Sequence, residues 1–190
     1  MATRATTIDL TQLGRAWRVN RHGCFSLHDS QGHPVQLRGR KARAIVAYLS
    51  DRLGEYVSRE RIIGLLWMDR QQAQARGSLR QSLVEIRREA PSLISSDTDH
   101  VWIDPCRVQK TPIDEAADDK PLFEDLDGIT AEFDEWLLCR RHEDSAARWS
   151  NLQCEVEASL SCGESAKALL LIERLQRIDP YNEDALRLAM

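Results

Sequence analysis

The segment 73–90 constrains the fold of this chain most, because it predicts a helix with two different faces. At about 100° per residue, one stripe has the spacing of a core-facing side: Ala75, Leu79, Leu83 and Ile86. Three arginines lie within about 40° of one another beside that stripe: Arg76, Arg80 and Arg87. Such a helix can be held from behind while its guanidinium groups donate to guanine or phosphate in a major groove. The alternative is an ordinary solvated face, since arginine is a good helix former on surfaces.

Charge is divided unevenly along the chain, which has 190 residues and a net charge of −4. Residues 1–104 contain 16 Lys and Arg against 11 Asp and Glu, and residues 105–190 contain 10 against 19. The two parts therefore carry +5 and −9. A basic part joined to an acidic part is expected when one module binds phosphate and the other does not.

The sequence has no apolar run of about 18 residues and no signal-peptide pattern, so we expect a cytoplasmic protein without membrane contact. Its five cysteines are odd in number and form no Cys-x-x-Cys pair, which is typical of reduced thiols. Four potential ligands lie within twelve residues but lack the spacing of a zinc site: His22, Cys24, His28 and His33. We therefore expect neither a metal nor a cofactor.

The first half predicts a small antiparallel sheet, three helices and a terminal hairpin. Strands are expected at 8–13, 24–28 and 34–37, with a further one possible at 17–19. Helices are expected at 39–53, from the N-cap candidate Ser58 onward, and at 73–90. The hairpin joins 93–96 to 101–104. This order indicates a winged helix-turn-helix domain over residues 1–104, whose third helix is free to enter a DNA groove.

The second half predicts an acidic linker and a helical domain. Residues 105–120 contain prolines and an acidic run, as linkers do. Residues 121–190 show helical spacing that is broken at Cys162, Gly163 and Glu164, and a last helix is expected to open at Pro180. Helix pairs with short turns are typical of tetratricopeptide-like arrays. Because the last helix has no partner, we expect the array to be incomplete at its C-terminus, or covered by another chain.

Several motifs resemble those of a known family, in the same order. Residues 37–44, 57–67 and 75–83, with Ile86, Arg87 and Arg88, are similar to the OmpR-type winged-helix domain of the SARP class of bacterial transcriptional activators. Residues 121–126, 133–137 and 168–185 resemble the bacterial transcriptional activator domain that follows it. Together the two resemblances cover nearly the whole chain.

The resemblance implies that helix 73–90 reads the major groove and that the hairpin touches the neighbouring backbone or minor groove. The candidates for base or phosphate contact on this helix are Arg76, Ser78, Arg80, Gln81 and Arg87. The candidates for backbone anchoring are Arg40, Lys41 and Arg43, for which a solvated helix start is the alternative. The hairpin departs from the pattern, because its turn carries Asp97 and Asp99 and no Lys or Arg occurs between Arg88 and Arg107.

The sequence therefore favours a DNA-binding transcriptional regulator, with an activator implied by the resemblance. The expected partners are double-stranded promoter DNA, a second copy of the chain on DNA, and RNA polymerase or a fused C-terminal effector domain. The alternative is a protein-interaction adaptor whose winged helix has lost DNA binding. An enzyme is not expected, because no paired carboxylates, nucleophile motif or Gly-rich phosphate loop is present in the sequence.

Overall fold

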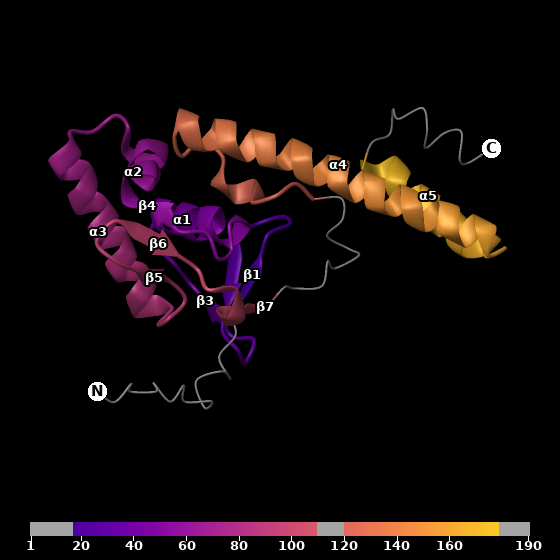
Figure 1. The fold of residues 1–190 in the computed structure, drawn as a ribbon, viewed down its shortest axis with the longest axis horizontal. Coiled ribbons are helices and arrows are strands. Elements are labelled where there is room, and N and C mark those ends of the chain that lie inside the picture. Colours follow the sequence, from indigo (N-terminus) through magenta and orange to yellow (C-terminus); the bar gives the residue numbers. More distant parts are fainter. Residues whose placement is uncertain (1–16, 110–119, 179–190) are drawn as a thin grey trace, which may run out of the picture.

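The computed structural model describes residues 17–109 and 120–178, and the first strands form a small sheet (Figure 1). The strand order is β3-β2-β1-β7, with β1 (Trp17–Asn20), β2 (Ser26–His28), β3 (Pro34–Val35) and β7 (Val108–Gln109). β2 and β3 confirm two expected strands, and β1 is the further strand considered at 17–19. β7 was not predicted, since it lies in the expected linker and pairs in parallel with β1. The strand expected at 8–13 lies outside the described residues.

Three helices come next: α1 (Arg40–Asp51), α2 (Arg59–Trp67) and α3 (Gln72–Glu89). α1 is the central helix, because eight of its twelve residues are buried: Ala42, Ala44, Ile45, Val46, Ala47, Tyr48, Leu49 and Ser50. Its sequence is apolar on several faces, which is the pattern of a helix enclosed on most sides. The helix expected at 39–53 is confirmed with a shorter end, because Leu53 lies beyond its last residue and is only partly buried.

α3 packs against α1 and α2 through the apolar stripe that the sequence predicts. Its four buried residues are those expected: Ala75, Leu79, Leu83 and Ile86. The helix begins and ends one residue earlier than predicted, and its last turn carries Arg87 and Arg88, where the helix dipole favours cations. α3 is therefore held by one face, and its opposite face is exposed.

α2 begins with the predicted N-cap, because Ser58 Oγ accepts a hydrogen bond from the backbone N–H of Arg61 at 3.2 Å. Ser58→Ala is expected to lower the free energy of unfolding by about 1 kcal/mol, since this N–H loses its acceptor. Urea denaturation measures the difference. Ser58→Asp keeps an acceptor and should retain most of the stability, whereas an unchanged midpoint in Ser58→Ala would contradict the capping role.

The wing is a hairpin of β5 (Ser95–Ser96) and β6 (His100–Trp102), which β4 (Val57–Ser58) extends to a three-stranded sheet of order β4-β6-β5. A short 3₁₀ helix, η2 (Pro105–Arg107), follows it. Asp97 Oδ1 shapes the turn by accepting hydrogen bonds from the backbone N–H groups of His100 and Asp99, at 2.6 and 2.8 Å. These bonds hold the pKa of Asp97 below its usual value. The negative charge of Asp97 disfavours DNA contact by the wing, but its carboxylate stabilises the hairpin turn.

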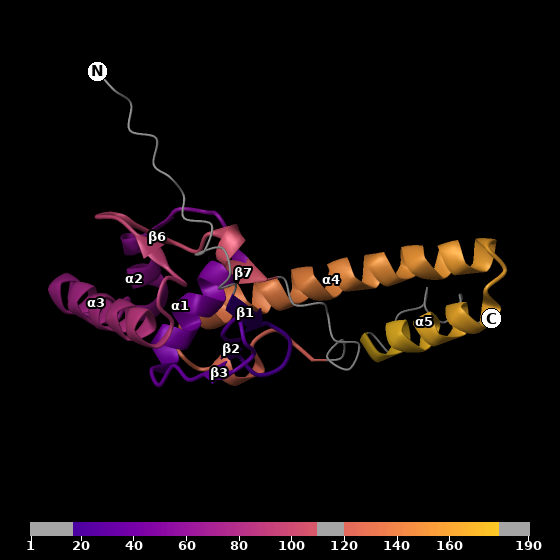
Figure 2. The ribbon, with the colours of Figure 1, turned by 90° about the horizontal axis from the view of Figure 1, so that it is seen from below.

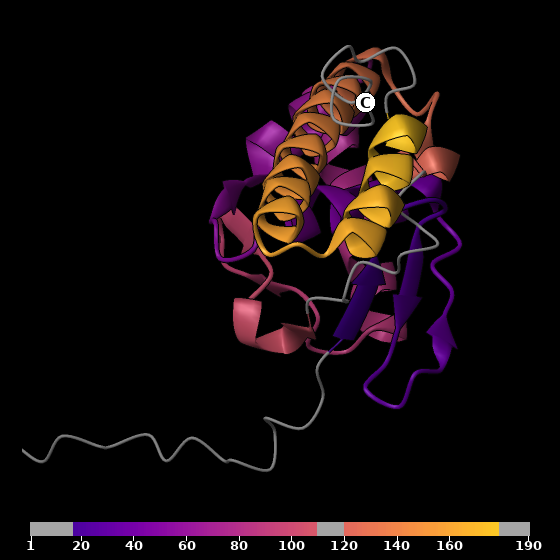
Figure 3. The same ribbon diagram turned by 90° about the vertical axis from the view of Figure 1, so that its right-hand side faces the viewer.

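The second half consists of η4 (Glu124–Leu126), α4 (Ala131–Ser161) and α5 (Ser165–Ile178). α4 and α5 lie side by side and antiparallel, and the predicted break at 162–164 forms the turn between them (Figures 2 and 3). The helix expected from Pro180 lies outside the described residues. Within the described part of the chain, no helix combines the length and apolar character that a membrane crossing requires. The predicted fold, a winged helix followed by a helical domain, is confirmed.

The hydrophobic core crosses from the first half into the second. Five buried side chains after the expected linker belong to the same core as α1, α2 and α3: Leu122, Phe123, Leu126, Phe133 and Leu137. A separate small core joins the far half of α4 to α5: Leu152, Val156, Leu171, Ile172 and Leu175. The domain bounds at 104 and 120 stay a prediction, and the start of α4 packs as part of the winged helix.

Candidate nucleic-acid interface

α3 lies at one end of the molecule, and the α4–α5 pair projects from the other (Figures 1 and 2). Along the exposed face of α3, the side chains include four arginines: Arg76, Arg80, Arg87 and Arg88. Val84 lies among them and is 56% exposed. The face therefore combines guanidinium groups with apolar surface.

The three arginines predicted on α3 differ in what they contact. Arg76 forms an ion pair with Glu60 of α2, with Nη2 and Oε1 2.7 Å apart, and both side chains are more than half exposed. Arg87 Nη2 donates to Ser96 Oγ in the wing. Arg80 has no hydrogen-bond or ion-pair partner among the described residues. Of the three, only Arg80 is thus available without breaking a contact.

A hollow of 380 Å³ opens beside Arg80, between α3 and the residues that precede α1. Its lining is Arg38, Arg80, Gln81, Val84, Glu85 and Arg88. Arg38, like Arg80, has no partner within 17–109 and 120–178, whereas Arg88 pairs with its neighbour Glu89 at 2.8 Å. Three guanidinium groups around an apolar floor suit an anion such as a phosphate.

The one carboxylate that lines the hollow, that of Glu85, already accepts a hydrogen bond from another part of the fold. Glu85 Oε1 accepts a hydrogen bond from the backbone N–H of Gly39 at 2.8 Å, at the start of α1. A Cβ at position 39 would lie 2.8 Å from Glu85 Oε2, so the carboxylate of Glu85 would have to move. Glu85 thus ties α3 to the start of α1 and places Arg38 beside Arg80.

Sequence reasoning missed Arg38 and Arg88. The signal for Arg88 was present, because Arg80, Val84 and Arg88 are spaced i, i+4 and i+8 and so share one side of the helix. Arg38 carried no such signal, since it lies outside the helix and approaches α3 only through the tertiary fold.

Ser78 and Gln81 occupy different parts of α3. Ser78 is half-buried, and its Oγ accepts a hydrogen bond at 3.2 Å from Nη1 of Arg70, which lies in the α2–α3 turn. Gln81 is exposed, lines the hollow and has no partner among the described side chains. Gln81 is therefore the better placed of the two to donate to an external ligand.

Two of the predicted anchoring residues on α1 contact the segment before α4. Arg40 Nη2 donates to the backbone carbonyl of Asp127 at 2.6 Å, and Arg43 Nη1 lies 2.9 Å from Asp125 Oδ2. These contacts link the winged helix to the second half. Their role as DNA anchors stays a prediction, and any such role would compete with contacts that hold the fold together.

Lys41, the third predicted anchor, is directed toward the end of α2. Its Nζ donates to the backbone carbonyl of Leu66 and lies 5.0 Å from the centroid of the Trp67 ring. Burial lowers the pKa of Lys41 from its ordinary value. The lysine therefore satisfies a carbonyl at a helix C-terminus, where cations are favoured.

The wing receives positive charge from its neighbours, although no Lys or Arg occurs in its own strands or turn. Arg59 Nη2 at the start of α2 donates to the carbonyl of Asp97 at 2.8 Å and to Ser96 Oγ at 3.3 Å. Arg87 reaches the same hydroxyl from α3. The sequence could not show this, because both arginines are remote from the hairpin turn.

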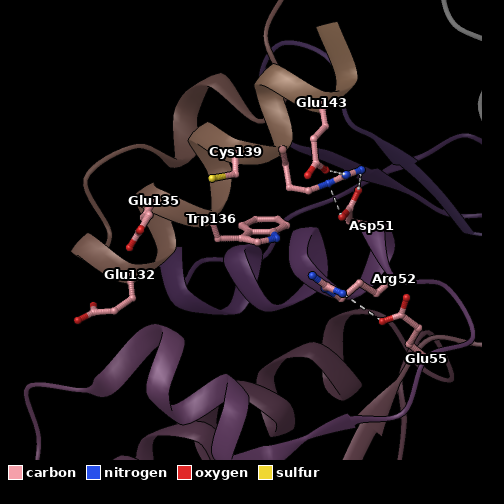
Figure 4. Close-up of a pocket in the computed structure, with 9 residues that line it drawn as sticks. Asp51, Arg52, Glu55, Glu132, Glu135, Trp136, Cys139 and Glu143 are labelled. Atoms are coloured by element: carbon pink, nitrogen blue, oxygen red, sulfur yellow. Dashed lines mark hydrogen bonds and ion pairs between the residues drawn. The ribbon is translucent and has the colours of Figure 1, made fainter. Parts of the chain in front are cut away.

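A second, larger hollow of 630 Å³ lies between the end of α1 and α4, and it is acidic (Figure 4). Its lining is Asp51, Arg52, Glu55, Glu132, Glu135, Trp136, Cys139, Arg140 and Glu143. Figure 4 shows the indole of Trp136 at its centre, between carboxylates on either side. Five carboxylates against two arginines repel phosphate, so this surface does not suit nucleic acid.

Among the described residues, no group of three or more His, Cys, Asp or Glu side chains could hold a metal ion. The five cysteines are free and exposed. Their exposure means that they contribute little to either core.

No family model matches the sequence, and no curated protein matches it. Among solved structures, the chain is similar to EmbR of Mycobacterium tuberculosis, determined in complex with a low-affinity phosphopeptide. The TM-score is 0.63 at 15% sequence identity, and the match covers 90% of this chain and 52% of the EmbR chain. The chain thus spans about half the length of EmbR. The likeness supports a SARP-like fold.

Proposed function

We propose that this chain is a DNA-binding transcriptional regulator whose α3 enters the major groove. The observation that carries the proposal is a pair of arginines, Arg38 and Arg80, that line one hollow beside Gln81 and have no partner among the described residues. Arg80 and Gln81 lie on the exposed side of α3, whose other side is buried. Arginine and glutamine are the side chains that read guanine and adenine in a fork, and arginine also neutralises phosphate. The SARP-like fold supports the same conclusion by analogy.

The contacts that these side chains make within the fold indicate a different role in DNA binding for each. Arg80 and Gln81 read base edges, and Arg38 and Arg88 neutralise phosphates beside the groove. Arg76 also contacts DNA, after it breaks its ion pair with Glu60. Breaking this pair costs little free energy, because exposed ion pairs are weak. Arg87 and Ser78 position the wing and the α2–α3 turn instead of binding bases directly.

The opposite end of the molecule serves protein contacts in this proposal. α4 and α5 project away from α3, so a partner can bind there while α3 occupies DNA (Figure 1). A second copy of the chain, RNA polymerase and a further effector domain are the proposed partners. Activation requires such a contact, because DNA binding alone only positions the protein.

The test is fluorescence anisotropy of the full chain on a mixed-sequence duplex, titrated across salt, and then on the duplex it selects from a randomised library. Arg80→Ala is expected to weaken binding to the selected duplex by about 1–3 kcal/mol, because a buried guanidinium contact to a base is lost. Lys167→Ala is the control, since it also removes one positive charge but lies on α5, and should leave binding unchanged. Equal effects of the two variants would remove Arg80 from the interface.

The second candidate is a protein-interaction adaptor, and the acidic hollow between α1 and α4 favours it. In this reading the winged helix is a scaffold and basic segments of partners bind its carboxylates. The same titration separates the two functions, because even non-specific DNA binders associate with duplex at low salt. A chain that binds no duplex there would support the adaptor.

A further inference from the structure

Gly77 is a glycine in the interior of α3, and glycine there weakens a helix relative to alanine. Some other glycines of this fold have an internal reason to be glycine, whereas Gly64 of α2, like Gly77, has none. Gly54 has a positive φ of 83°, and a Cβ at Gly39 would displace the Glu85 carboxylate that accepts a hydrogen bond from the Gly39 N–H. Gly77 has neither, because its φ is not in the left-handed region and a Cβ at its position would meet no atom within 4 Å. The folded protein alone does not explain this residue.

The position of Gly77 on α3 indicates an external reason. It is exposed, and it lies about 60° from Arg80 and about 40° from Gln81 around the helix. It therefore shares the outward face with the two side chains proposed to read bases. Where a backbone must come close to a ligand, glycine is the residue that permits it.

We propose that Gly77 is the point at which the backbone of α3 comes closest to the base edges of DNA, and that it sets the depth of the helix in the groove. This inference rests on the proposed function. A methyl group at position 77 would hold the helix away from the groove floor. Arg80 and Gln81 would then be displaced from bases that they must reach within about 2.7–3.2 Å.

The structure supplies a matched control in Gly64, which lies within α2 and whose Cβ position is equally open. Both Gly77→Ala and Gly64→Ala are expected to raise Tm by about 2–4 °C, since both remove a helix-weakening glycine without strain. Only Gly77→Ala is expected to weaken binding, by about tenfold, to the duplex that the wild type selects from a randomised library. Gly77→Ala should therefore be more stable but bind more weakly than the wild type, whereas Gly64→Ala should be more stable with unchanged affinity.

Each other outcome overturns the inference in an identifiable way. If Gly77→Ala binds the selected duplex as tightly as the wild type, the proposed function stands and the role of Gly77 is wrong. If Gly77→Ala lowers Tm, the glycine has an internal role instead. If the wild type selects no duplex, both the proposed function and this inference fail. Equal losses of affinity in Gly77→Ala and Gly64→Ala would place the effect on the fold and not on the α3 face.

Discussion

Replacing Phe133 with alanine should lower the free energy of unfolding by about 3–5 kcal/mol, the usual range for a fully buried phenylalanine. Phe133 is at the start of α4, yet its side chain has no exposed surface and belongs to the core formed by α1, α2 and α3. Its ring also lies 5.2 Å, between centroids, from that of Trp136, which in turn packs against Tyr48 of α1. The cavity would therefore open in the winged helix itself.

Urea denaturation followed by circular dichroism gives the size of this effect, and hydrogen exchange locates it. We expect amide protection to fall in α1 as well as in α4. Leu138→Ala is the matched control, because Leu138 is also an apolar residue near the start of α4 but is 56% exposed, and its loss should change stability by less than about 0.5 kcal/mol. Loss of protection confined to α4 would contradict a shared core and would favour two independent domains.

The shared core has a practical consequence for fragments. A fragment of residues 1–104 lacks Leu122, Phe123 and Phe133, which are fully buried against the winged helix, and it also lacks β7. Such a fragment would expose apolar surface and lose part of its first sheet. DNA binding is therefore best measured with the full chain, as in the titrations above.

Local patterns explain why much of the fold could be predicted. The buried face of α3 can be predicted from the apolar periodicity of its own eighteen residues. The N-cap at Ser58 can likewise be predicted from the residues at the start of α2. The packing of 121–137 could not be predicted in this way. Its apolar residues have helical spacing, but spacing does not say which other surface they cover, and the acidic run before them suggested a separate domain.

The candidate site was predictable to the same degree. Periodicity placed Arg76, Arg80 and Arg87 on one side of α3, as the structure has them. Whether each arginine is free to bind a ligand could not be predicted, since it depends on partners outside the local pattern. Glu60 is sixteen residues from Arg76, and Ser96 is nine residues from Arg87. The cations on α1 show the same effect more strongly, since Arg40 and Arg43 contact residues more than eighty positions away. A helical wheel predicts the direction of a side chain but not the residues of other elements that it contacts.

Replacing Asp51 with alanine is the second change for which we expect a large effect. Asp51 ends α1, and its side chain is only 5% exposed. Its Oδ1 accepts a hydrogen bond from Arg140 Nη2 of α4 at 2.9 Å and another from Arg21 between β1 and β2, and its Oδ2 lies 2.8 Å from Arg140 Nε in the same ion pair. One buried carboxylate thus joins three parts of the fold. Its removal would leave two guanidinium groups close together without their shared anion.

We expect Asp51→Ala to lower the free energy of unfolding by about 3 kcal/mol, the low end of the range for breaking a buried pair, because both arginines are about one-third exposed. Glu55→Ala is the matched control in the same acidic hollow: its pair with Arg52 is exposed, so its loss should change stability by less than about 1 kcal/mol. Hydrogen exchange should show loss of protection in the half of α4 that contains Arg140, with α3 unaffected. Equal, small effects of the two variants would mean that apolar packing alone holds α4 on the winged helix.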